Sequence, residues 1–141
     1  MKREIRVAVI NIVLDTNILV SAAWSPRRNA SNILYACFSG KFNVCYDFRI
    51  LEEYERVLHY PKFHFSEWEI QAVLDPLIKN GISVIPDPVL NVSFERDESD
   101  RKFYEVACFC NAFLVTGNLV HYPEAPFILS PASFCEKFGL I

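Results

Sequence analysis

Residues 7–17 read Val-Ala-Val-Ile-Asn-Ile-Val-Leu-Asp-Thr-Asn. The first eight of these residues are nearly all apolar and rich in β-branched side chains. This pattern favours a strand over 7–14 that is covered on both faces, as in a parallel sheet. A secretory leader is disfavoured, because Asn11 interrupts the apolar run and Asp15 ends it. The stretch therefore predicts a buried strand that ends directly on an acidic residue.

Outward from this strand, apolar strand-like segments alternate with segments of helical periodicity. Asp47 can cap a helix that stops before Pro61. Ser66 and Glu69 form a capping box at the start of the next helix. That helix is predicted to end at Asn80-Gly81, with the C-cap in the left-handed conformation. The expected strands are 7–14, 44–46, 82–85, 112–115 and 127–129, and the expected helices are about 29–40, 47–58, 66–80, 99–110 and 130–139. This alternation predicts an α/β fold with a parallel sheet between helices.

The chain has 141 residues, of which 52% are hydrophobic, and a formal net charge of −3. This length fits a single domain over 1–141, and the charge does not indicate a strongly basic nucleic-acid-binding domain. No apolar run approaches the about 18 residues that a membrane span needs, so no membrane association is expected. The five cysteines contain no C-x-x-C pair, which favours buried reduced thiols in a cytoplasmic protein.

Four acidic residues stand at positions that can converge. Asp15 follows the first strand, Glu53 borders the apolar stripe of its helix, and Asp97 and Asp100 stand at the start of the helix near 99–110. Ligands of parallel α/β sheets bind beyond the carboxyl ends of the strands. Each acid also has a plain structural interpretation, as a cap for the three aspartates and as a boundary residue for Glu53. Clustered carboxylates need a counter-charge, however, and hard oxygen ligands favour Mg²⁺ or Mn²⁺.

The ordered motifs of the chain resemble those of the PIN-domain family of metal-dependent ribonucleases, in particular the branch of toxin components of toxin–antitoxin pairs. The resemblance covers nearly the whole chain and rests on several short segments in family order. These are Leu14-Asp15-Thr16-Asn17, residues 51–58 with Tyr60-Pro61-Lys62-Phe63, residues 97–103, residues 113–118 and residues 129–134. The resemblance implies a three-layer αβα PIN-like fold with a central, mainly parallel sheet of about four or five strands.

The resemblance also implies roles for the acidic residues. Asp15, Glu53 and Asp100 would be the catalytic acids and metal ligands, with Asp97 as an accessory ligand. Asn118 departs from the family pattern, because the family usually has Thr-Gly-Asp where this chain has Thr-Gly-Asn. An asparagine keeps an oxygen ligand but loses the negative charge, which should weaken the binding of the metal.

Several polar and basic residues are candidates for binding substrate. By the resemblance, Thr16, Asn17 and Thr116 would support the acids or contact substrate, although Thr16 and Asn17 can also simply satisfy the turn after the strand. Arg27 and Arg28 can contact RNA phosphates, and Trp24 beside them can stack on a base. Arg101 and Lys102 adjoin Asp100, and ordinary solvated surface charge is the alternative for all four basic residues. The full set of predicted substrate-binding residues is Thr16, Asn17, Thr116, Arg27 and Arg28.

These features together predict a cytoplasmic, metal-dependent endoribonuclease that uses Mg²⁺ or Mn²⁺ to activate a water against an RNA phosphodiester. The resemblance further implies a toxin role, a small antitoxin protein as partner, and self-association as a homodimer or higher oligomer. Asn118 motivates an alternative, a PIN-fold RNA- or protein-binding module of weak or absent activity. A phosphatase of the haloacid dehalogenase type is disfavoured, because it needs a second aspartate where this chain has Asn17.

Overall fold

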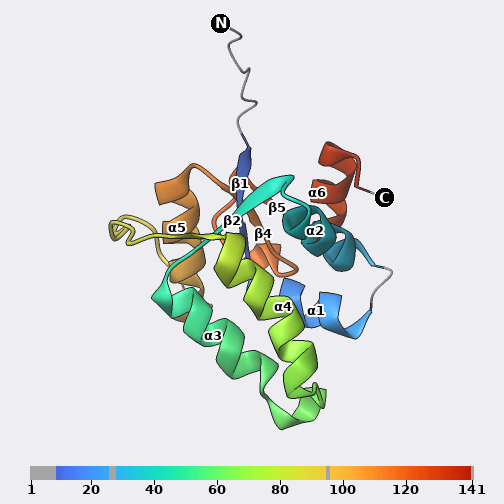
Figure 1. The fold of residues 1–141 in the computed structure, drawn as a ribbon. Helices are drawn as coiled ribbons and strands as arrows, with labels where there is room; N and C mark the ends of the chain where they lie inside the picture. Colours follow the sequence, from blue (N-terminus) through green and yellow to red (C-terminus); the bar gives the residue numbers. More distant parts are fainter. Residues whose placement is uncertain (1–8, 26–27, 95, 141) are drawn as a thin grey trace, which may run out of the picture.

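A five-stranded, wholly parallel sheet forms the centre of the molecule (Figure 1). The computed structural model describes residues 9–25, 28–94 and 96–140. The strands lie in the order β3-β2-β1-β4-β5, so that β1 is central. Their bounds are β1 (Ile10–Leu14), β2 (Phe42–Tyr46), β3 (Ile82–Ser83), β4 (Phe113–Val115) and β5 (Ile128–Leu129). The predictions of an α/β fold and of a mainly parallel sheet are confirmed.

Helices cover both faces of this sheet (Figure 1). Helix α5 packs on β1, β2 and β4, whereas α2 and α4 pack on β2. Helix α1 packs against α2 and α4, and α6 packs against α2. The helices are α1 (Thr16–Trp24), α2 (Asn29–Phe38), α3 (Phe48–Leu58), α4 (Glu67–Asn80), α5 (Arg101–Cys110) and α6 (Pro131–Phe138), with short 3₁₀ helices η1 (Pro61–Phe63), η2 (Glu98–Asp100) and η3 (Leu119–His121). The predicted three-layer αβα arrangement is confirmed. In the described part of the chain, no helix is long and apolar enough to cross a membrane.

The local signals in the sequence place the starts of α3, α4 and α6 correctly. The Asp47 side chain accepts a hydrogen bond from the backbone N–H of Ile50 and so caps α3. Ser66 and Glu69 form the predicted capping box at α4. Ser130 caps α6, and the left-handed Gly139 ends it. These caps satisfy orphan N–H and C=O groups within the segment itself, so they can be recognised without knowledge of the tertiary contacts.

The prediction for Gly81 is wrong. Its φ is −81°, so the residue does not lie in the left-handed region. A Cβ at this position would lie 2.4 Å from the carbonyl oxygen of Leu77 and 2.9 Å from that of Val44. Glycine is therefore required by the close approach of α4 to β2 rather than by a left-handed turn.

Several element boundaries also differ from the expectations. Strand β2 begins at Phe42 rather than at residue 44, and α5 begins at Arg101, after the short 3₁₀ helix η2. Strand β3 ends at Ser83, because the ladder stops before Pro86 and Pro88, which have no N–H to donate. Helix α1 directly follows Asp15, where the sequence analysis placed only a turn. Within the described residues β1 begins at Ile10, and residues 7 and 8 of the expected strand lie outside them.

Cys37, Cys45 and Cys135 are buried as expected, but Cys108 is exposed.

The strand order creates a switch point at the middle of the sheet. From β1 the chain moves outward to β2 and β3, and it then returns to place β4 on the other side of β1. In parallel α/β sheets, ligands bind in the crevice beyond the carboxyl ends of the strands at such a point. Asp15 follows β1 and Thr116 follows β4, so these two residues flank the crevice.

Candidate functional site

The site lies at the carboxyl edge of the sheet, where the neighbouring strands end level with one another. Leu14 pairs with Val115, and Val115 pairs with Leu129. The backbone N–H of Asp15 donates to the carbonyl oxygen of Val115 at 3.0 Å, which continues the ladder by one residue. Asp15 is thus fixed by backbone hydrogen bonds before its side chain makes any contact.

The Asp15 carboxylate is directed into the crevice between β1 and β4. Asp15 occupies the N-cap position of α1, but its side chain makes no capping hydrogen bond. Its Oδ2 instead accepts from Thr116 Oγ1 at 2.7 Å and from Tyr122 Oη at 3.1 Å. Burial raises the pKa of Asp15, the two hydroxyl donors oppose that change, and the nearby charge of Glu53 adds to it. The predicted acid is therefore a buried, oriented carboxylate rather than a helix cap.

Glu53 reaches the same edge from α3. The neighbouring Tyr54 is fully buried and donates its hydroxyl to the carbonyl oxygen of Leu14 at 2.5 Å, which fastens α3 to the end of β1. The Glu53 carboxylate accepts from Thr16 Oγ1 and lies 2.8 Å from Lys102 Nζ. Arg56 stands farther off, at 4.0 Å. The sequence analysis thus placed Glu53 correctly at the border of the buried face.

Asp97 and Asp100 differ in their roles, although they stand close together in the sequence. Asp97 is exposed and caps η2, accepting from the backbone N–H and the hydroxyl of Ser99, and these hydrogen bonds lower its pKa. Asp100 is buried, makes no capping hydrogen bond and contacts His121 Nδ1 at 3.1 Å. Burial raises the pKa of Asp100 to about 6, with further contributions from the negative charges of Asp15 and Asp97. Asp100, and not Asp97, is therefore the inward-facing acid.

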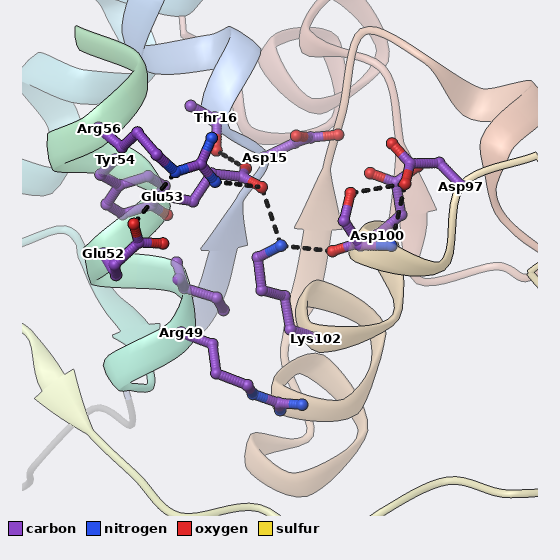
Figure 2. A network of polar contacts seen from close by, with 12 residues as sticks. Asp15, Thr16, Arg49, Glu52, Glu53, Tyr54, Arg56, Asp97, Asp100 and Lys102 are labelled. Carbon is purple, nitrogen blue, oxygen red and sulfur yellow. Dashed lines mark hydrogen bonds and ion pairs between the residues drawn. The ribbon is translucent and has the colours of Figure 1, made fainter. Parts of the chain in front are cut away.

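Figure 2 shows Lys102 between Glu53 on one side and the segment of Asp97 and Asp100 on the other. Carboxylate oxygens of this kind suit a hard divalent cation such as Mg²⁺ or Mn²⁺. Within residues 9–25, 28–94 and 96–140, however, no three His, Cys, Asp or Glu side chains stand close enough together to hold a metal ion. Each acid has its own protein partner, and for Glu53 that partner is a cation. The donor chemistry fits a metal, but the ligands are not drawn together.

Of the predicted polar residues, Thr16 and Thr116 bond to the acids, whereas Asn17 bonds to the backbone. Thr16 donates to Glu53, Thr116 donates to Asp15, and Asn17 Oδ1 accepts from the backbone N–H of Gly117 at 3.2 Å. Asn118 is exposed, and its backbone N–H donates to Thr116 Oγ1 at 3.0 Å. A hydrogen-bond chain therefore runs from Asn118 through Thr116 to Asp15.

The basic residues expected to contact RNA fall into different settings. Arg28 is exposed immediately before α2, and Arg27 lies outside the described residues. Trp24 is exposed at the end of α1 and packs edge-on against Phe63, with 5.3 Å between ring centroids. Arg101 donates to the backbone carbonyl oxygens of Val89 and Val92, so it holds the preceding loop rather than facing a ligand.

Two residues of the site were missed from the sequence. Tyr122 bonds to Asp15, and His121 bonds to Asp100, both from the segment that follows β4. Neither residue stands at a spacing that links it to an acid, because the chain separations are 107 and 21 residues. The one signal in the sequence was their position shortly after a predicted strand, since residues that follow the strands of a parallel sheet lie near the ligand-binding edge.

Comparison with known proteins shows the family and the fold of the chain. The sequence model of the PIN-domain family matches residues 11–119. The uncharacterized protein MJ1680 of Methanocaldococcus jannaschii is 32% identical over 110 residues, which cover 77% of this chain and 71% of that protein. The crystal structure of PAE2754 from Pyrobaculum aerophilum superposes with a TM-score of 0.61 at 15% identity, covering 92% of this chain and 90% of that one. At that identity the structural likeness concerns the fold alone.

Proposed function

This chain belongs to the PIN-domain family, whose members are generally nucleases, and from that premise we propose that it is a metal-dependent endoribonuclease. The observation that carries the proposal is that Asp15, Glu53 and Asp100 reach one edge of the sheet from three separate elements, where the charge of Glu53 acts on Asp15 and that of Asp15 acts on Asp100, although these acids are not gathered into a ligand set in the described residues. The charges of Asp15 and Asp97 help to raise the pKa of Asp100, and that of Glu53 helps to raise the pKa of Asp15. Such mutual repulsion is relieved by a bound cation.

Asp15, Asp100 and Glu53 would hold Mg²⁺ or Mn²⁺, with Asp97 and Asn118 at the rim. When bound, such a cation activates water and neutralises charge on a phosphate. The chain supplies orientation: Thr116 and Tyr122 fix one oxygen of Asp15, and Thr16 fixes one oxygen of Glu53. Arg28 and Trp24, both exposed, would contact RNA through a phosphate and a base.

The replacement Asp15→Asn tests this function in a cleavage assay on single-stranded RNA with Mg²⁺ or Mn²⁺. We expect the variant to lose at least about 100-fold in cleavage rate, because a central carboxylate is neutralised without a change of shape. Asp75→Asn, which makes the same change at an exposed position on α4, is the matched control and should cleave like the unmodified protein. Equal activity of the Asp15→Asn protein and its parent would contradict the mechanism.

The toxin role and the antitoxin partner are part of the same proposal, and they are supported by the resemblance of the ordered motifs to the toxin branch of the family. Induced expression in a bacterial host should arrest growth, because cleavage of cellular RNA stops protein synthesis. The Asp15→Asn protein, expressed at the same level, should not arrest growth. Arrest by both proteins would show that the effect does not depend on the acidic site.

Asn118 favours a second candidate, a PIN-fold binding module with little nuclease activity. The amide of Asn118 supplies no negative charge, so the metal would depend on the three inner acids alone. Calorimetric titration separates the two functions. Binding of Mg²⁺ or Mn²⁺ favours the nuclease, whereas no binding at millimolar concentration favours the module.

A further inference from the structure

Lys102 is an enclosed cation at the acidic site. Its Nζ lies 2.8 Å from Glu53 Oε1, and the two side chains are only 11% and 14% exposed. Nζ also donates to the carbonyl oxygen of Ser99. Lys102 stands in the first turn of α5, where the helix dipole disfavours a positive charge. The position of this ammonium is therefore explained by the acids it faces rather than by its own helix.

The other basic residues nearby are engaged elsewhere. Arg56 is about half exposed and bonds to Glu52 and Tyr60. Arg49 pairs with Asp47 and Glu105. Among the described residues, Lys102 makes the closest basic contact to Glu53, and Figure 2 shows it projecting from α5 toward that carboxylate.

We propose that Lys102 is the resident counter-ion of the acidic site, and that its ammonium group and a divalent cation compete for Glu53. This inference rests on the proposed metal-dependent function. It explains why the acids meet at one edge without forming a ready ligand set in the described residues. With Lys102 on Glu53, the charge repulsion among the acids is reduced before any metal arrives. Once the cation takes Glu53, the ammonium is displaced.

The structure provides room for that displacement. A hollow of about 430 Å³ opens between α3 and α5, and Lys102 lies in its wall together with Glu52, Glu98 and Ser99. The flexible four-carbon stem of lysine allows Nζ to move into this space. There the ammonium would meet water and the exposed carboxylates of Glu52 and Glu98, which it would share with Arg56 and Arg101.

Titration of the purified protein with Mn²⁺ by calorimetry tests the competition. Lys102→Met should bind Mn²⁺ about tenfold more tightly than the unmodified protein, because the metal no longer has to displace a positive charge. Lys102→Gln is the second variant, which keeps a polar end group and should change affinity in the same direction. Lys41→Met is the matched control, since Lys41 is exposed next to the start of β2 at the opposite edge of the sheet. Its Mn²⁺ affinity should not change.

A second measurement, of the free energy of unfolding, tests the contact between Lys102 and Glu53 directly. Unfolding of Lys102→Met, Glu53→Gln and the double variant in the presence of a chelator should show that the two single changes are not additive. In saturating Mn²⁺ this coupling should disappear, because Glu53 is then held by the metal.

The outcomes are distinct. Equal or weaker Mn²⁺ binding by both Lys102 variants, with normal binding by the unmodified protein, overturns the competition and leaves the proposed nuclease function standing. Additive effects of Lys102→Met and Glu53→Gln in chelator overturn it too. Absence of Mn²⁺ binding in every protein overturns the metal-dependent function and this inference with it.

Discussion

At the scale of the residue, Asp100 shows how burial prepares a carboxyl group for a cation. Burial, followed by the negative charges of Asp15 and Asp97, raises its pKa to about 6, while the contact with His121 acts in the opposite direction. Ionised Asp100 is therefore a source of instability in the metal-free protein. Groups tuned in this way are concentrated at functional sites.

Asp100→Asn should stabilise the metal-free protein at high pH only. The folded-state pKa of about 6 lies above the ordinary value of 3.8, so the unfolded chain ionises first and folding loses free energy as pH rises from about 4 to above 6. At pH 8 the variant should be more stable by about 3 kcal/mol, since the two pKa values lie about 2 pH units apart and each unit is worth about 1.4 kcal/mol. At pH 4 the difference should vanish.

Denaturant unfolding at the two pH values, in the presence of a chelator, measures this change. Asp75→Asn on the exposed face of α4 serves as the control and should show no comparable dependence on pH. A variant that is less stable than its parent at pH 8 would mean that the negative charge of Asp100 is favourable in the folded protein.

At the scale of the element, one polar clasp sets the position of α5 against α3. Arg49, in the first turn of α3, pairs with Asp47 at 2.7 Å and with Glu105 of α5 at 2.9 Å. The other oxygen of Glu105 accepts from the backbone N–H of Val89 at 2.7 Å, which ties down the loop between β3 and η2. Asp47 and Glu105 are buried, so these contacts are shielded from water. The clasp thereby holds Lys102 of α5 opposite Glu53 of α3.

Glu105→Gln should lower the free energy of unfolding by about 2 kcal/mol. Only one of the two side-chain atoms can then accept, so either Arg49 or the Val89 N–H loses its partner in a buried setting. Glu52→Gln is the matched control, because Glu52 is exposed and its pairing with Arg56 should contribute less than about 1 kcal/mol. Denaturant unfolding of both variants tests the difference, and equal losses would show that the buried clasp contributes little.

At the scale of the whole molecule, the sheet order places the site. Placing β4 next to β1, rather than next to β3, opens the crevice at the centre of the sheet. Side chains from α3, η2 and the segment after β4 then converge on the end of β1. A cation held there would link elements from the whole length of the chain, so its binding should stabilise the fold globally.

Mn²⁺ at about 100 times its dissociation constant should stabilise the protein by about 2.7 kcal/mol. For a chain of this size this corresponds to an increase in Tm of roughly 5–10 °C. Calorimetric scans with Mn²⁺ and with chelator measure the change. Asp15→Asn should show little of it, whereas Asp75→Asn should show all of it. An unchanged Tm in the unmodified protein would contradict binding of the metal to the native state.

The sequence by itself determined the succession of strands and helices, because periodicity, caps and proline positions act within a few residues. Examples of such local signals are the capping box of Ser66 and Glu69, the helix start at Ser130 and Pro131, and the apolar run that ends on Asp15. It also pointed to Asp15, Glu53 and Asp100, since each stands at a strand end, a helix border or a helix start. Only the tertiary structure decided that Lys102 contacts Glu53, that Tyr122 bonds to Asp15, and that Gly81 is required by the close approach of α4 to β2. Those contacts depend on how α5, α3 and the segment after β4 pack together, and no local pattern records the packing of segments so far apart in the chain.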